Sequence, residues 1–205
     1  MTGGDRPDSG CLIVSNHLGM IDPFVIGGTF RVVFSAKAEM LHWPVAGWVC
    51  RTIDLIPVYR GRRSRTGEFA AAVAERLRSG LNVLAFPEGT TSGGTDILPF
   101  KTGAFAAVES LDDGLVLPVT LRVTKIDGRA PDSHAHALFT WADTSKPLIS
   151  HFWQLLGITS AVVEIDVAAP INTAGRSRKE LADTAYEIIR ASSSAQKLEK
   201  GELTT

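Results

Sequence analysis

The chain has few cysteines, no long apolar run and almost no net charge, and each of these shortages excludes a class of protein. Two cysteines, Cys11 and Cys50, are too few for a disulfide scaffold and favour a reducing compartment. No window approaches the roughly 18 consecutive apolar residues that span a bilayer, and the polar first residues lack the apolar core of a signal peptide. A net charge of −1 argues against a general nucleic-acid binder. We therefore expect a protein that is cytoplasmic or lies on a membrane without crossing it.

Two common enzyme motifs are also missing. There is no Gly-rich phosphate loop followed by Lys and Ser or Thr, which argues against a P-loop nucleotide hydrolase. There is no Gly-x-Ser-x-Gly turn either, which argues against a serine hydrolase. The 205 residues suffice for one substantial core but not for two independent domains. A mean hydropathy of +0.10 suggests that some apolar surface stays exposed.

Strand-like and helix-like segments alternate along the chain, which predicts an α/β fold. We expect one domain at 11–192 with a mixed, mostly parallel sheet flanked by helices, a flexible N-terminus at 1–10 and a C-terminal tail at 193–205. Pro118 falls inside an expected strand, and we expect it at a sheet edge, a bulge or a strand end. The strands are expected at 11–15, 31–35, 53–59, 81–86, 115–123, 137–141 and 161–167, and the helices at 23–29, 44–51, 66–79, 101–111 and 177–192.

His17 and Asp22 lie in the turn between the first expected strand and the first expected helix. Pro23 favours the first helical position, which makes Asp22 the expected N-cap, and Gly19 allows the chain to fold back. In such a turn Asp22 can accept a hydrogen bond from one ring nitrogen of His17. That bond fixes the tautomer and leaves the other nitrogen free as a base. The alternative is that Asp22 only caps the helix and that His17 is a loop histidine without a catalytic role.

A second polar loop, 86–92, follows the apolar strand expected at 81–86. Loops at the carboxyl ends of strands in α/β sheets commonly bind ligands. Glu88 can accept a hydrogen bond from a substrate hydroxyl, and Gly89 permits close approach of the backbone. The alternative is a polar turn bounded by Pro87 and Gly89.

A basic segment follows the strand expected at 53–59. Arg60 comes directly after that strand and suits a two-point contact with a phosphate. Three further arginines follow in this segment, Arg62, Arg63 and Arg65. They either contact anionic lipid head groups or, as we favour, belong to a solvated basic loop.

Two other segments leave alternatives open. His134 and His136 would share one face of a strand and suggest a metal site with Cys50 or Asp132, but no third ligand is evident and we expect no metal. The apolar segment 148–156 suits either a membrane interface or, as we favour, packing in the core.

Four segments together resemble the motifs of the glycerolipid acyltransferase family, typified by the 1-acylglycerol-3-phosphate (lysophosphatidate) acyltransferases. The first motif is Asn-His with Asp after four further residues, met by Asn16, His17 and Asp22. The second is an apolar strand that ends in Arg, similar to 53–60, and the third is Phe-Pro-Glu-Gly-Thr, present at 86–90. A fourth, an apolar stretch around a proline, is similar to 116–119. The four occur in the family's order within residues 11–123.

The resemblance implies an O-acyltransferase of phospholipid biosynthesis, peripheral on the cytoplasmic face of the cell membrane. It would move a fatty acyl chain from an acyl carrier protein or coenzyme A thioester to the free hydroxyl of a lysophospholipid, converting lysophosphatidate to phosphatidate, without a metal or redox cofactor. His17 is the implied general base, and Asp22 would orient it and stabilise the imidazolium. The residues implied to bind the acceptor head group are Arg60, Glu88, Gly89 and Thr90, with Lys37 as a further phosphate-binding candidate.

The sequence departs from the family pattern in two places. Thr91 stands where many members have Arg, which weakens the case for a phosphate-bearing acceptor and is similar to members that acylate lyso-ornithine lipid. Members usually carry a helical segment ahead of the first motif, whereas only 15 residues precede Asn16, so an upstream segment is expected to be missing or shortened. The alternatives are therefore an acyltransferase for another lyso-lipid, such as lyso-ornithine lipid, and a non-catalytic lipid-binding module of the same fold.

Overall fold

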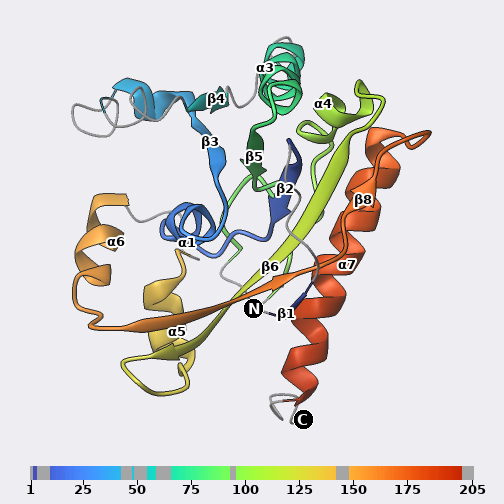
Figure 1. The fold of residues 1–205 in the computed structure, drawn as a ribbon. Coiled ribbons are helices and arrows are strands. Elements are labelled where there is room, and N and C mark those ends of the chain that lie inside the picture. The colour runs from blue at the N-terminus through green and yellow to red at the C-terminus, as the bar shows by residue number, and fades with distance from the viewer. Residues whose placement is uncertain are drawn as a thin grey trace.

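Within the described residues, eight strands form one sheet with helices on both faces (Figure 1). The computed structural model describes residues 2–3, 10–42, 48, 55–58, 66–92, 96–141 and 148–199. Along the sheet the strands follow the order β1-β7-β6-β2-β5-β3-β4, and β8 also pairs with β6. The strands are β1 (Thr2–Gly3), β2 (Leu12–Ser15), β3 (Val32–Lys37), β4 (Ile56–Val58), β5 (Asn82–Ala85), β6 (Leu115–Ile126), β7 (Ala161–Val167) and β8 (Ile171–Asn172).

The helices divide between the two faces of the sheet (Figure 1). None of those in the part of the chain that the structure describes is both long and apolar enough to cross a membrane. The helices are α1 (Asp22–Gly27), the 3-10 helix η1 (Ala38–His42), α3 (Thr66–Arg78), α4 (Phe105–Glu109), α5 (Ser133–Phe139), α6 (Leu148–Leu155) and α7 (Arg178–Glu199).

Two apolar cores result, one on each face of the sheet, because successive strand side chains point in opposite directions. Leu12 and Val14 of β2 pack in the core that α3, α4 and α7 cover. Ile13 of the same strand packs in the other core, which α1, α5 and α6 cover. All three side chains are fully buried, so β2 joins the two cores.

β2 also lies between two strands that run parallel to it, β5 and β6. Leu12 is paired with Val83 of β5 on one side and with Val116 of β6 on the other. Because parallel strands end at the same edge of a sheet, the loops after β2 and β5 emerge next to each other. These are the loops that contain His17 and Glu88.

The structure confirms the predicted fold class and most of the predicted elements. The strand at 161–167 is found as expected, and the central strand expected at 115–123 continues to Ile126. The helix expected at 101–111 is shorter, at Phe105–Glu109, while the last helix runs to Glu199, beyond its expected end at 192. Of the strand expected at 53–59, residues 56–58 are described and form β4. The helix expected at 44–51 lies outside the described residues apart from Trp48.

The strand expected at 137–141 is wrong, because residues 133–139 form helix α5. Asp132 is its N-cap, and the carboxylate accepts a hydrogen bond from the Ala135 backbone nitrogen at 2.7 Å. In a helix two residues turn through about 200°, so His134 and His136 point to different sides and do not share the face that a strand would give them.

The expectation for Pro118 is also wrong, because this residue lies inside β6 with strands on both sides. Its backbone oxygen accepts a hydrogen bond from the Ala168 nitrogen at 3.1 Å, so its nitrogen faces the same side. On that side β7 has ended at Val167 and β8 begins only at Ile171. Pro118 lies opposite Ala168 and makes only one of the two hydrogen bonds of a full antiparallel pair, and the regular pairing with β7 stops at this position.

Candidate active site

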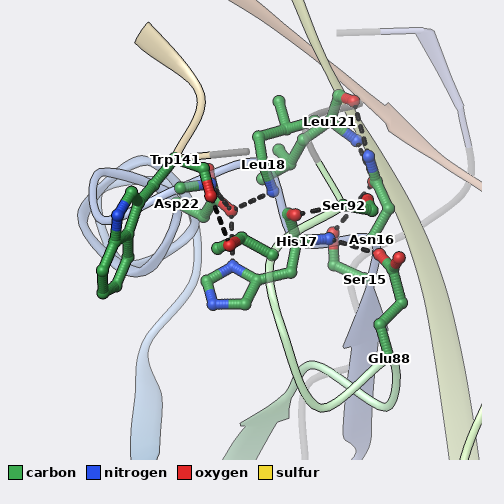
Figure 2. Close-up of polar contacts among 11 residues, drawn as sticks. Ser15, Asn16, His17, Leu18, Asp22, Glu88, Ser92, Leu121 and Trp141 are labelled. Carbon is green, nitrogen blue, oxygen red and sulfur yellow. Dashed lines mark hydrogen bonds and ion pairs between the residues drawn. The ribbon is translucent and has the colours of Figure 1, made fainter. Parts of the chain in front are cut away.

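Asn16 fixes the start of the loop that carries His17. Its side-chain nitrogen donates to the Leu121 oxygen at 3.0 Å, and its side-chain oxygen accepts from the Leu121 nitrogen at 2.8 Å. The side chain of Asn16 thus continues the pairing of β2 with β6 for one residue past the end of β2 (Figure 2). Asn16 is 2% exposed, so its position is tightly set in the interior. Its amide is a site feature that the sequence did not reveal.

The predicted pair of His17 and Asp22 is present (Figure 2). His17 Nδ1 lies 2.7 Å from Asp22 Oδ2, and the same oxygen accepts hydrogen bonds from the Leu18 and Gly19 nitrogens at 2.6 and 2.9 Å. A carboxylate only accepts hydrogen bonds, so in the neutral imidazole Nδ1 carries the proton and Nε2 keeps its lone pair. The structure gives Nε2 no partner among the described residues.

Asp22 is not the N-cap of α1, in contrast to the sequence-based expectation. The cap position is Ile21, and no side chain caps this helix end within the described residues. Asp22 is instead the first residue of α1, and its buried carboxylate turns back toward the loop that precedes it. Its hydrogen-bond donors are therefore two N–H groups of the loop and the imidazole, and not the N–H groups of the first helical turn that an N-cap would bind.

The second loop, 86–92, contacts His17 at three points. The ring of Phe86 stacks on the imidazole with centroids 4.2 Å apart and planes 15° apart. Glu88 Oε1 accepts from the His17 backbone nitrogen at 2.7 Å, and the Ser92 nitrogen donates to the His17 oxygen at 3.0 Å. The two motifs that the sequence placed in separate loops therefore form one site.

Glu88 is 2% exposed, and both of its oxygens have protein donors. Besides the His17 nitrogen at Oε1, the Leu98 backbone nitrogen donates to Oε2 at 2.9 Å. Burial raises the pKa of this carboxyl group above its usual value, and the N–H donors of Leu98 and His17 and the hydroxyl of Ser92 counteract part of that rise. The predicted contact of Glu88 with the acceptor stays a prediction.

Gly89 adopts φ +73°, a conformation that few other residues accept. A Cβ here would also lie 2.4 Å from Lys101 Nζ, so glycine lets this ammonium group lie against the loop. Lys101 has no ion-pair partner in the described part of the chain, and the sequence pattern gave no reason to place it at the site. Thr90, predicted to bind the acceptor, is half-buried beside Gly89.

Two further predicted residues are less fully described. Lys37 is the last residue of β3 and is paired with Val58 at the end of β4, but its side chain lies outside the described residues. Arg60 lies outside the described residues altogether. Both roles stay predictions.

Thr91 has a partner that the sequence did not indicate. Its hydroxyl donates to the Trp141 backbone oxygen at 2.5 Å, and the Trp141 nitrogen donates to the Leu18 oxygen at 3.1 Å. Thr91 is only 8% exposed. The position where many family members have Arg is thus buried and links the end of α5 to the His17 loop.

Comparison with known protein families decides the family. The model of the family described as Acyltransferase matches residues 4–122, which include both loops of the site. The chain belongs to the acyltransferase family. The resemblance that the four motifs predicted is therefore confirmed at the level of the family.

The relatives of this acyltransferase have two kinds of name. It is 34% identical over 191 residues to a lyso-ornithine lipid O-acyltransferase of Brucella abortus, covering 89% of this chain and 71% of that protein. It is 30% identical over 185 residues to a 1-acyl-sn-glycerol-3-phosphate acyltransferase of Neisseria gonorrhoeae, covering 89% of this chain and 69% of that protein. The chain thus spans about two thirds of the length of these relatives.

A solved structure has the same fold as this acyltransferase. The 1-acyl-sn-glycerophosphate acyltransferase PlsC of Thermotoga maritima superposes with a TM-score of 0.63 over 94% of this chain and 68% of that chain. The two are 22% identical, so the likeness establishes the α/β fold with its mostly parallel sheet.

Proposed function

We propose that this acyltransferase moves a fatty acyl chain from a thioester of acyl carrier protein or coenzyme A to the free hydroxyl of a lyso-lipid, with His17 as the general base. One observation supports the base assignment most directly. The buried carboxylate of Asp22 holds Nδ1 of His17 at 2.7 Å, which leaves the lone pair of Nε2 for an incoming hydroxyl.

The proposed reaction is a direct transfer between two bound substrates. Nε2 of His17 takes the hydroxyl proton as the acceptor oxygen attacks the thioester carbonyl carbon. The tetrahedral intermediate then expels the thiolate, which receives the proton from the imidazolium, and an ester and a free thiol result. Asp22 stabilises the imidazolium through Nδ1. The steps require no metal or redox cofactor.

A covalent acyl-enzyme on Cys11 has no support in the geometry. This thiol is fully buried, and burial raises its pKa to about 12. It is therefore a thiol rather than a nucleophilic thiolate at neutral pH.

For the acceptor we favour lyso-ornithine lipid, with lysophosphatidate as the second candidate. Four relatives at 31–34% identity have the first name, and three relatives named for the second are 30% identical. Thr91 also supports this choice, because its buried hydroxyl bonds to Trp141 where Arg would suit a phosphate. The acceptor head group would lie against Gly89 and Thr90, with Lys101, Lys37 and Arg60 as the candidate cations.

We further propose that the protein works at the inner face of the cell membrane as a peripheral protein. An acceptor with a long acyl chain is presented by a membrane surface. Helix α6 suits such a surface, because Phe152 and Trp153 on its exposed side are 41% and 65% accessible to solvent, and Leu156 directly after it is 60% accessible.

The test is an acyl-transfer assay of the full chain and of His17→Ala with both acceptors and both thioester donors. We expect His17→Ala to lower kcat/KM by about 10²–10⁴-fold, the contribution of a positioned base. His134→Ala, which changes an exposed histidine on α5, is the matched control and should transfer at the wild-type rate. Lyso-lipid binding without any transfer would instead identify a lipid-binding module.

A further inference from the structure

We propose that Glu88 is a positioning residue for the catalytic base and not a ligand for the acceptor lipid. The inference relies on the proposed function only in naming His17 as the base. Glu88 hydrogen-bonds to the backbone nitrogen of His17 and not to its ring, so this contact acts on the base through the position of the loop.

The carboxylate of Glu88 is already used on both sides. Oε1 accepts from the His17 nitrogen at 2.7 Å and Oε2 from the Leu98 nitrogen at 2.9 Å, inside a residue that is 2% exposed. Its lone pairs could accept a further hydrogen bond, but a side chain that is 2% exposed gives an acceptor hydroxyl no open approach to either oxygen. The burial of the carboxylate therefore argues against acceptor binding at Glu88.

Glu88 connects two segments that are far apart in the sequence. One is the loop that carries His17, and the other is the segment around Leu98 that leads toward α4. Together with Ser92, which donates to the His17 oxygen, Glu88 fixes both peptide groups of His17. Asp22 and Phe86 then only need to orient the ring.

Glu88→Gln is the sharpest substitution, because it keeps the shape and removes one acceptor. The amide oxygen can serve the His17 or the Leu98 nitrogen, while the amide NH₂ meets the other N–H donor to donor. The peptide of His17 should move, and Nε2 with it, by a few tenths of an ångström or more. Misplacing a catalytic group slows the chemical step without weakening acceptor binding.

We therefore expect Glu88→Gln to lower kcat by roughly 10- to 100-fold while the KM for the acceptor is unchanged. The matched control is Glu187→Gln, which changes an exposed carboxylate on α7 and should leave both constants at the wild-type values. A raised KM for the acceptor with an unchanged kcat would overturn the inference, because that pattern identifies a binding residue.

A second measurement needs no turnover. In the wild-type protein, amide NMR should show the backbone protons of His17 and Leu98 far downfield and shifting together as the Glu88 carboxyl titrates. Leu98 is the cleaner reporter, because the His17 amide belongs to the same residue as the imidazole that interacts electrostatically with Glu88. Two amides that titrate independently of each other would overturn the inference. Joint titration in a protein without transfer activity would leave the positioning role standing and refute the proposed function alone.

Discussion

His151 is a buried histidine that the proposed reaction does not use. It is 2% exposed, and its ring stacks on that of Trp141 with centroids 5.9 Å apart. Nε2 of His151 and Nε1 of Trp141 are both buried, and neither has a hydrogen-bond partner among the residues that the structure describes. Burial lowers the pKa of His151 below its usual value, because the charged ring has lost its hydration.

This lowered pKa makes the stability of the protein depend on pH. As the pH falls below about 6.5, the unfolded chain binds a proton at His151 that the folded protein refuses, so the free energy of unfolding should decrease. His151→Phe should remove that part of the slope. Urea unfolding at about pH 7.5 and about pH 5.5 measures it.

The comparison of wild type with His151→Phe isolates this residue. The raised pKa of Glu88 contributes the opposite slope, because there the folded protein binds the proton more readily, but both proteins carry Glu88. Equal losses of stability on acidification in the two proteins would show that His151 can ionise without unfolding.

Helix α6 has one side in the protein and one in solvent. His151 is buried and Leu155 packs against the core under α1 and α5, while Phe152 and Trp153 are exposed. The sequence favoured core packing for this whole segment. Core packing does not explain the exposed aromatic side chains, whereas the proposed contact with a membrane surface would.

The double substitution Phe152→Ser and Trp153→Ser should weaken binding to lipid vesicles by roughly tenfold, because about 1.4 kcal/mol of apolar burial is lost. Co-sedimentation with vesicles that contain anionic lipid measures the change. Val162→Ser on β7 is the matched control, since Val162 is also an exposed apolar residue at 48%. Equal vesicle binding of all three proteins would remove α6 from the proposed membrane contact.

At the scale of the whole molecule, one of the two cores lies under the helix that carries Asp22, and the other lies on the opposite face of the sheet. Ile26 is buried in the core on the α1 side, on the helix that begins with Asp22. Ile189 is equally buried on the opposite face, on α7. The same truncation can therefore be made near the pair of His17 and Asp22 and on the far side of the sheet.

Either Ile26→Ala or Ile189→Ala should lower the free energy of unfolding by about 2–5 kcal/mol. Only Ile26→Ala should also lower the kcat of the folded protein, because it loosens the helix that carries Asp22. Urea unfolding and acyl transfer, measured on the same samples and corrected for the folded fraction, test this. A matching loss of kcat in Ile189→Ala would mean that the site is sensitive to both cores.

Much of the site was predictable from local sequence, and what was missed depends on distant contacts. The meeting of His17 and Asp22 follows from a short turn that ends where α1 begins, at Asp22, one residue before Pro23. The bonds of Glu88 to His17 and Leu98 depend on the parallel pairing of β2 with β5, which no local pattern specifies.

The wrong elements have the same origin. The apolar residues at 137–139 fit a short strand or a helix turn equally well, and the deciding signal was the N-cap at Asp132. Pro118 argued against a central strand, and the gap between β7 and β8 that accommodates it appears only when the sheet is assembled.

The central place of β2 has a consequence for synthesis on the ribosome. Both strands that flank it, β5 and β6, are translated later, so the apolar segment 11–15 emerges with two open edges and nothing to pair with. The hydrogen bond of Asn16 to Leu121 and that of the His17 backbone to Glu88 can form only after these later residues have been synthesised. His17, the proposed base, is thus among the first residues of the site to be made and among the last to be fixed in place, and a nascent chain that stops before β6 leaves β2 without one of its two partner strands.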